Sequence, residues 1–212
     1  DEPSQKTARI MEEISTQINS ILANEPDANT ALFRGFDVYH SLPTLKERFG
    51  LNALAVASYP MYRGLAALVG MKLSRLPADD KEAIEVAHSE FKDSPEFDYL
   101  FLHIKKADSY GEDGNFDEKV HILEQIDELI PRVVELNADV LIITGDHSTP
   151  SVLKSHSWHP VPLLIKAPTV RPDNVEHFNE RACLGGGLGI LPAKKIMQLA
   201  LAYAQKLTKF GA

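Results

Sequence analysis

The stretch from Asp98 to Thr144 decides the fold class of this chain. It opens with the apolar run "DYLFLHI" (98–104), continues through polar "KKADSYGEDGN" (105–115), and closes with a second apolar run, "DVLIIT" (139–144). From Phe116 onward, the residues between the two runs place apolar side chains at the three-to-four residue spacing of an amphipathic helix. Strand, helix and strand in this order predict one unit of a parallel sheet.

The same alternation extends on both sides of this stretch. Each predicted strand is nearly all apolar, as expected for strands that are covered on both faces. We therefore predict an α/β fold, with a mostly parallel sheet and helices on both of its faces. The other predicted elements are a helix over 4–24, a strand over 30–33, a short helix over 43–50, a strand over 53–57, a helix over 77–91, a strand over 162–166 and a closing helix from about Pro192.

Composition excludes several classes of partner. The chain has 212 residues, 44% of them hydrophobic, and a formal net charge of −8. That length supports at least one sizeable core, and the acidic balance argues against nucleic acid or an anionic membrane as partner. Cys183 is the single cysteine, so no disulfide can form within the chain and a reducing compartment is the simple interpretation. We predict a cytoplasmic protein that binds neither membrane nor nucleic acid; the sequence does not assign its oligomeric state.

Two polar segments contain the residues that can bind metal. Segment 105–115 offers Asp108 and Glu112, four residues apart, so that one helical turn would point both carboxylates the same way. Segment 145–160 offers Asp146, His147 and His159. Both segments follow predicted strands and should meet at one edge of the sheet. Carboxylate and imidazole ligands suit manganese or zinc; the alternative is two solvated polar loops.

Basic residues near strand ends are candidates for holding an anion. Arg34 and Arg63 lie in the segments "FRGF" and "YRGL", and Lys105 flanks the acidic segment. Arginine binds carboxylate or phosphate in a bidentate way. The alternative for each arginine is an ordinary surface salt bridge.

Other polar residues have simpler interpretations. His156 is expected to form hydrogen bonds within its loop or to support a metal ligand, and His103, inside a predicted strand, to be a satisfied core histidine. The glycines of "CLGGGLGILP" (183–192) are expected to form a flexible turn, because no strand directly precedes them. Ser148 lacks the surroundings of an activated nucleophile, so the chain contains candidate metal ligands without a convincing nucleophile.

Three segments together carry a resemblance to a known family. They are "YPMYRGLAALVGM" (59–71), "FLHIKKADSYGEDGNFDEKV" (101–120) and "ADVLIITGDHSTPSVLKSHSWHPVPLLIKAP" (138–168), the last preceded by Asn137 where the motif has Asp. The chain resembles the cofactor-independent (2,3-bisphosphoglycerate-independent) phosphoglycerate mutases of the archaeal type, which belong to the alkaline phosphatase superfamily.

The resemblance implies interconversion of 3-phosphoglycerate and 2-phosphoglycerate, in glycolysis or gluconeogenesis, through a phosphoserine. It implies two divalent metal ions, manganese first, with zinc, cobalt and magnesium as alternatives. By motif, Asp146 and His147 look like ligands of the metal that activates the serine, and Asp108 and His159 like ligands of the second metal. Glu112 stands where many relatives have histidine. Arg34 resembles a substrate-gripping arginine, and Arg63 is a weaker match.

The family's nucleophilic serine motif does not occur in this chain, so no catalytic nucleophile is assigned. The resemblance implies that residues 1–50 are the end of an inserted substrate-binding domain and that residues 51–212 are the carboxyl-terminal part of an alkaline phosphatase-like metal-binding domain. Such a chain is expected to be inactive alone. Two alternatives stay open: a metal-dependent phosphatase or phosphonate hydrolase of the same superfamily, and a metal-binding fragment without turnover.

Overall fold

A computed structural model describes residues 2–38 and 40–207 of the chain. These residues divide into two compact units, Asp1–Ser41 and Leu42–Ala212. The first unit contains the predicted amino-terminal helix, α1 (Glu2–Ile21). Residues 30–33, predicted as a strand, form neither helix nor strand. Apolar residues alone do not make a strand, because a strand also needs a neighbour for its backbone hydrogen bonds.

The second unit contains a parallel sheet of three strands in the order β2-β1-β3. The strands are β1 (Ala53–Val56), β2 (Lys72–Leu73) and β3 (Tyr99–Leu102). All four residues of β1 are buried, as expected for a central strand. The parallel α/β arrangement predicted from the sequence is confirmed for these strands, although β2 was not predicted.

Two further strands, β4 (Leu141–Thr144) and β5 (Leu163–Lys166), form an antiparallel pair separate from the three-stranded sheet. The expectation that the strands on either side of the long helix pair in one parallel sheet is therefore wrong for β3 and β4. The segment between them returns the chain from the carboxyl end of β4 to the amino end of β5, which is what an antiparallel pair requires. A bridge between Ser148 and Ser157 closes this long loop. The loop therefore stays at the end of β4 where the sequence predicted a site.

The helices of the second unit correspond largely to the predicted ones. The segment 105–115, expected to be polar with a solvated loop as the alternative, is mostly helical, and the segment after β1 contains a helix that was not predicted. Gly114, with a φ of 72°, ends the first of these helices, and Asn115 caps the next one through the backbone N–H of Glu118. The helices are α2 (Leu45–Phe49), α3 (Pro60–Leu68), α4 (Asp80–Glu90), α5 (Lys106–Asp113), α6 (Phe116–Val134), α7 (Glu180–Cys183) and α8 (Ile196–Tyr203), the last preceded by the 3-10 turn η1 (Ala193–Lys195).

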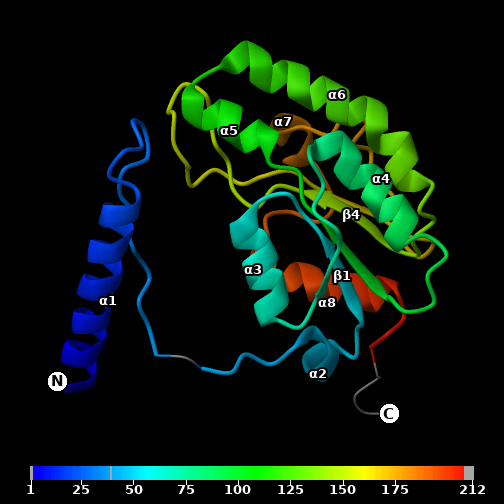
Figure 1. Cartoon of the computed structure of the whole chain (residues 1–212). Helices are drawn as coiled ribbons and strands as arrows, with labels where there is room; N and C mark the ends of the chain where they lie inside the picture. Colours follow the sequence, from blue (N-terminus) through cyan, green and yellow to red (C-terminus); the bar gives the residue numbers. More distant parts are fainter. Residues whose placement is uncertain (1, 39, 208–212) are drawn as a thin grey trace. The chain divides into compact units, whose positions relative to one another are not determined.

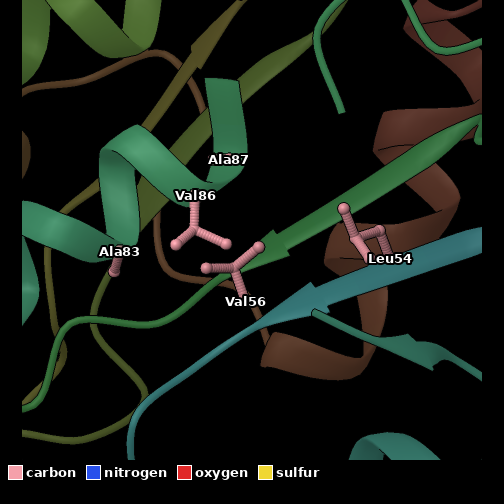
Figure 2. Packing of buried hydrophobic residues seen from close by; sticks show 5 residues of the cluster. All are labelled: Leu54, Val56, Ala83, Val86 and Ala87. Carbon is pink, nitrogen blue, oxygen red and sulfur yellow. The ribbon is translucent and has the colours of Figure 1, made fainter. Parts of the chain in front are cut away.

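The main core lies between β1 and α4. Leu54 and Val56 point to one face of the sheet, and Figure 2 shows Val56 opposite Val86 of α4. Ala83 and Ala87 on the same helix let it approach the strands closely. In the view of Figure 1, α4 and α6 lie above the strands and α8 below them. Among the described residues, no helix combines the length and the apolar character needed to span a membrane.

Candidate metal centre

Three strands deliver polar side chains to one place at their carboxyl ends. Tyr62 follows β1 on α3, Asp108 follows β3 on α5, and Asp146 and His147 follow β4. This is where ligands bind in open α/β sheets. The two polar segments do meet, as the sequence predicted.

The start of α5 is held in place by α4. Asp80, only 7% exposed, accepts the backbone N–H of Lys105 at 3.3 Å and that of Lys106 at 3.2 Å. A buried carboxylate with such partners fixes the backbone that precedes Asp108. The position of Asp108 is thus determined by the core helix as well as by its own strand.

Asp108 is the most connected carboxylate of the site. Its Oδ1 accepts a hydrogen bond from Thr149 Oγ1 at 2.5 Å, and its Oδ2 accepts one from Lys105 Nζ. Burial acts to raise the pKa of Asp108, but the hydrogen bonds from Lys105 and Thr149 outweigh it and lower the pKa. The side chain is therefore an anion with a fixed orientation.

Asp108, His147 and His156 each offer a ligand atom within 4.8 Å of the other two. His156 Nε2 lies 3.6 Å from Asp108 Oδ1 and 3.4 Å from Glu112 Oε1. The rings of His147 and His156 lie with their centroids 3.7 Å apart. One carboxylate and two imidazoles at this spacing, with a second carboxylate beside them, match the donor types that manganese and zinc accept.

Asp146 lies beside this group and contacts both His147 and Tyr62. Its Oδ2 lies 3.4 Å from His147 Nε2 and accepts a hydrogen bond from the Tyr62 hydroxyl. Burial acts to raise the pKa of Asp146, but the Tyr62 hydrogen bond and the nearby His147 outweigh it and lower the pKa. Burial and the Asp146 hydrogen bond together raise the pKa of Tyr62 well above its ordinary value, so the phenol remains a donor.

His103 lies behind Tyr62 and differs from the satisfied core histidine that the sequence suggested. The two rings stack with centroids 3.9 Å apart. Burial lowers the pKa of His103, and its buried Nδ1 has no hydrogen-bond partner among the described residues. A neutral, flat ring is thus available to support Tyr62.

His159, predicted as a ligand, lies outside the group of three. Its Nδ1 is 2.9 Å from Ser157 Oγ, and its ring stacks on exposed Trp158 with centroids 4.9 Å apart. His156, three residues earlier, lies instead with its Nε2 within 3.6 Å of both Asp108 and Glu112. The histidine that the structure brings to Asp108 is therefore His156.

The predicted anion-binding residues lie in different settings. Lys105 is part of the site, and its Nζ also lies 5.2 Å from the centroid of the Tyr59 ring. Arg63 donates to the carbonyl oxygens of Ala57 and Ser74, at 3.0 and 2.8 Å, and these contacts favour a role in bracing the fold. Arg34 is exposed in the first unit.

Sequence reasoning missed several residues that build this site. Tyr62 and Thr149 contact the candidate ligands only after folding, and Asp80, within the helix predicted over 77–91, bonds the backbone of Lys105 and Lys106 only after folding. One feature of the sequence could have pointed to Thr149: it directly follows "GDHS" in the motif segment.

Comparison with known proteins agrees with a metal centre. Residues 15–203 match the family model described as "Metalloenzyme superfamily". The chain belongs to the metalloenzyme superfamily.

Relatives within this superfamily have a more specific description. The chain is 50% identical over 212 residues to a protein of Thermotoga maritima and over 210 residues to one of Aquifex aeolicus. Both are described as "Probable 2,3-bisphosphoglycerate-independent phosphoglycerate mutase". The matches cover 100% and 99% of this chain but 52% and 51% of the relatives. The chain thus spans about half the length of the curated relatives it matches.

Solved structures confirm the fold. The PH0037 protein of Pyrococcus horikoshii is similar with a TM-score of 0.85 and 30% identity, over 99% of this chain and 60% of that protein. The cofactor-independent phosphoglycerate mutase of Thermoplasma acidophilum gives a TM-score of 0.63 over 95% of this chain and 52% of that enzyme. At 20% identity, the second likeness concerns the fold alone. The predicted alkaline phosphatase-like α/β fold is confirmed.

Proposed function

We propose that this chain supplies much of a two-metal site for divalent ions, manganese first. The observation that carries the proposal is the convergence of Asp108, His147 and His156, whose ligand atoms lie within 4.8 Å of one another. Glu112 and Asp146 adjoin this group and complete a set of five donors. Divalent ions held there would supply positive charge that lowers the pKa of a hydroxyl and offsets the charge of phosphoryl oxygens.

The five donors fall into two sets by their contacts. Asp146 and His147 Nε2 face each other and would share one ion, while Asp108, Glu112 and His156 surround a second position. His147 adjoins both positions, because its Nδ1 also lies 3.8 Å from Asp108 Oδ1. His159 was expected from the sequence as a ligand of that second ion, and we propose His156 there because of its distances to both carboxylates.

We further propose that the whole protein interconverts 3-phosphoglycerate and 2-phosphoglycerate, in glycolysis or gluconeogenesis and in the cytoplasm. The half-length match to relatives described as phosphoglycerate mutases supports this proposal. In it, residues 1–50 are the end of an inserted substrate-binding domain, and the nucleophilic serine belongs to a part of the protein outside this chain.

Basic residues of the chain would hold the substrate. Lys105 contacts Asp108 at the centre and can turn its ammonium group toward a phosphate. Arg34 would bind the carboxylate of the glycerate. Arg63 is the weaker candidate, because two backbone carbonyls already engage its guanidinium group.

The proposal is tested by an assay of 3- and 2-phosphoglycerate interconversion with manganese. The 212-residue chain is compared with the longer protein that includes the serine. We expect the chain alone to bind metal but not to turn over, and the longer protein to produce the isomer without releasing phosphate. In the longer protein, Arg34→Ala should lower kcat/KM with little change in melting temperature.

Other outcomes of this assay distinguish the alternatives. Release of inorganic phosphate without isomer, unaffected by Arg34→Ala, would indicate a phosphatase or phosphonate hydrolase. Turnover by the short chain would mean that it contains a nucleophile after all, and Ser148, beside His147, would be the first residue to replace.

A further inference from the structure

The Thr149 side chain joins the two sets of candidate ligands. It is 4% exposed, and its hydroxyl lies 2.5 Å from Asp108 Oδ1 and 3.1 Å from His147 Nδ1. Asp108 belongs to one proposed metal position and His147 to the other. A single buried hydroxyl thus contacts both.

The number of protons on these groups fixes the direction of the hydrogen bonds. A threonine hydroxyl has one proton to donate and lone pairs to accept with. A carboxylate can only accept, so the hydroxyl proton of Thr149 goes to Asp108. The short contact with His147 can then be a hydrogen bond only if Nδ1 carries the proton and Thr149 accepts it.

We propose that Thr149 is a positioning residue that holds His147 in its Nδ1–H tautomer and so turns the lone pair of Nε2 toward Asp146. His147 Nε2 lies 3.4 Å from Asp146 Oδ2, on the side where the two residues would share an ion. An imidazole binds metal through its unprotonated nitrogen, and the partner of the other nitrogen decides which one that is. This inference rests on the proposed metal site.

The surroundings of Thr149 hold its hydroxyl in one place. Lys119 of α6 donates to the Thr149 carbonyl oxygen at 2.5 Å. Gly111 of α5 faces the same carbonyl so closely that an added Cβ would lie within 3.0 Å of the oxygen. Two helices therefore clamp the backbone of Thr149, and its hydroxyl is positioned by the fold rather than by the loop alone.

The first test reads the tautomer directly and does not depend on activity. The 15N chemical shifts and two-bond proton couplings of His147 are recorded by NMR on the intact chain, without metal, at a pH of about 9, where an ordinary imidazole is neutral. We expect the Nδ1–H pattern in the wild type and in Thr149→Ser, which keeps the hydroxyl. In Thr149→Val, which has a similar shape but no hydroxyl, we expect the pattern to move toward Nε2–H.

A matched control and a second readout complete the test. Thr144→Val removes a hydroxyl that, within residues 2–38 and 40–207, bonds two carbonyl oxygens, those of Gly145 and Pro162, and it should leave the His147 pattern unchanged. In calorimetric titrations with Mn²⁺, Thr149→Val should weaken binding about 10-fold, within the range found for groups that orient metal ligands, and Thr149→Ser should restore most of it.

The tautomer of His147 in the wild-type chain tests the proposal even if the Thr149→Val chain does not fold. An Nε2–H pattern for His147 in the wild type would overturn it, as would an unchanged Nδ1–H pattern in a folded Thr149→Val chain. Failure of the chain to bind Mn²⁺ would instead count against the proposed metal site and would leave the tautomer result standing.

Discussion

The two halves of the candidate site are built in different ways. Asp108 and Glu112 lie on a helix, α5, whose start is fixed by Asp80 and whose end is fixed by Gly114. Asp146, His147 and His156 lie on a long loop that is closed by the Ser148–Ser157 bridge and fastened through Thr149. The helical half is shaped mainly by local periodicity, whereas the loop half is shaped by contacts between residues distant in sequence.

This difference sets what each half contributes. A helix presents residues four apart on one face whatever surrounds it, so α5 offers a preformed pair of carboxylates. The loop obtains its geometry from hydrogen bonds to that helix, and it should lose its geometry when those bonds are removed. Changes on α5 should therefore disturb both halves, and changes in the loop mainly one.

The largest effect on metal binding is expected from Asp108→Ala. This change removes a proposed ligand together with the acceptor of the Thr149 and Lys105 hydrogen bonds. We expect affinity for Mn²⁺ to fall about 100-fold, which corresponds to roughly 2.7 kcal/mol. Calorimetric titration of the chain measures it. Asp113→Ala, an exposed acid at the end of the same helix, is the control; an equal loss there would show that bulk negative charge, not the site, attracts the ion.

Gly111→Ala tests the contact between the two halves. An added Cβ would meet the backbone carbonyl oxygen of Thr149, which cannot move without shifting the loop. Overpacking of this kind costs about 1–3 kcal/mol, so we expect the free energy of unfolding in urea to fall by about 2 kcal/mol.

The control for this change lies in another helix. Gly64 in α3 has open space around its Cα, with nothing within 4 Å of an added Cβ. Gly64→Ala should therefore stabilise the chain by about 0.5–1 kcal/mol, the ordinary gain of replacing glycine inside a helix. If both changes stabilised the chain, α5 and the loop would not be in close contact in solution.

The same contrast explains how much could be predicted from the sequence. Most of the strands follow from short, nearly continuous apolar runs, and the long helix α6 and the spacing of Asp108 and Glu112 follow from a period of three to four residues, both of which a sequence displays directly. The choice between His156 and His159 depends on contacts that form only in the folded loop, those of His156 with Asp108 and Glu112 and those of His159 with Ser157 and Trp158. Tyr62 and Thr149 were missed because their partners, Asp146 and Asp108, lie 84 and 41 residues away.

A pair of histidine variants sharpens the comparison within the loop. His156→Ala should weaken Mn²⁺ binding about 10-fold, or roughly 1.4 kcal/mol, because its Nε2 faces both Asp108 and Glu112. His159→Ala should change the affinity less than about 2-fold, because its ring bonds Ser157 and stacks on Trp158. The reverse order of effects would show that His159 is the ligand, as the sequence alone suggests.

The smallest effect is expected from Tyr62→Phe, which removes one hydrogen bond to Asp146 and keeps the aromatic ring on His103. Two consequences oppose each other. Asp146 loses a partner that orients it, which weakens metal binding, but it also loses a donor that competes with the ion for the same oxygen. We therefore expect a net loss of only about 3-fold in Mn²⁺ affinity, roughly 0.65 kcal/mol.

The pH dependence separates these two consequences. The Tyr62 hydrogen bond helps to keep the pKa of Asp146 below its ordinary value, so its removal raises that pKa. Protons compete with metal for a carboxylate, and in Tyr62→Phe the loss of Mn²⁺ binding on acidification should begin at a higher pH than in the wild type. The ring of Tyr59 faces Lys105 rather than Asp146. Tyr59→Phe should therefore lose Mn²⁺ binding on acidification at the same pH as the wild type. Loss of Mn²⁺ binding at the same acidic pH in all three proteins would mean that Tyr62 does not bond Asp146 in solution. The loop half would then be held by Thr149 and the Ser148–Ser157 bridge without support from α3.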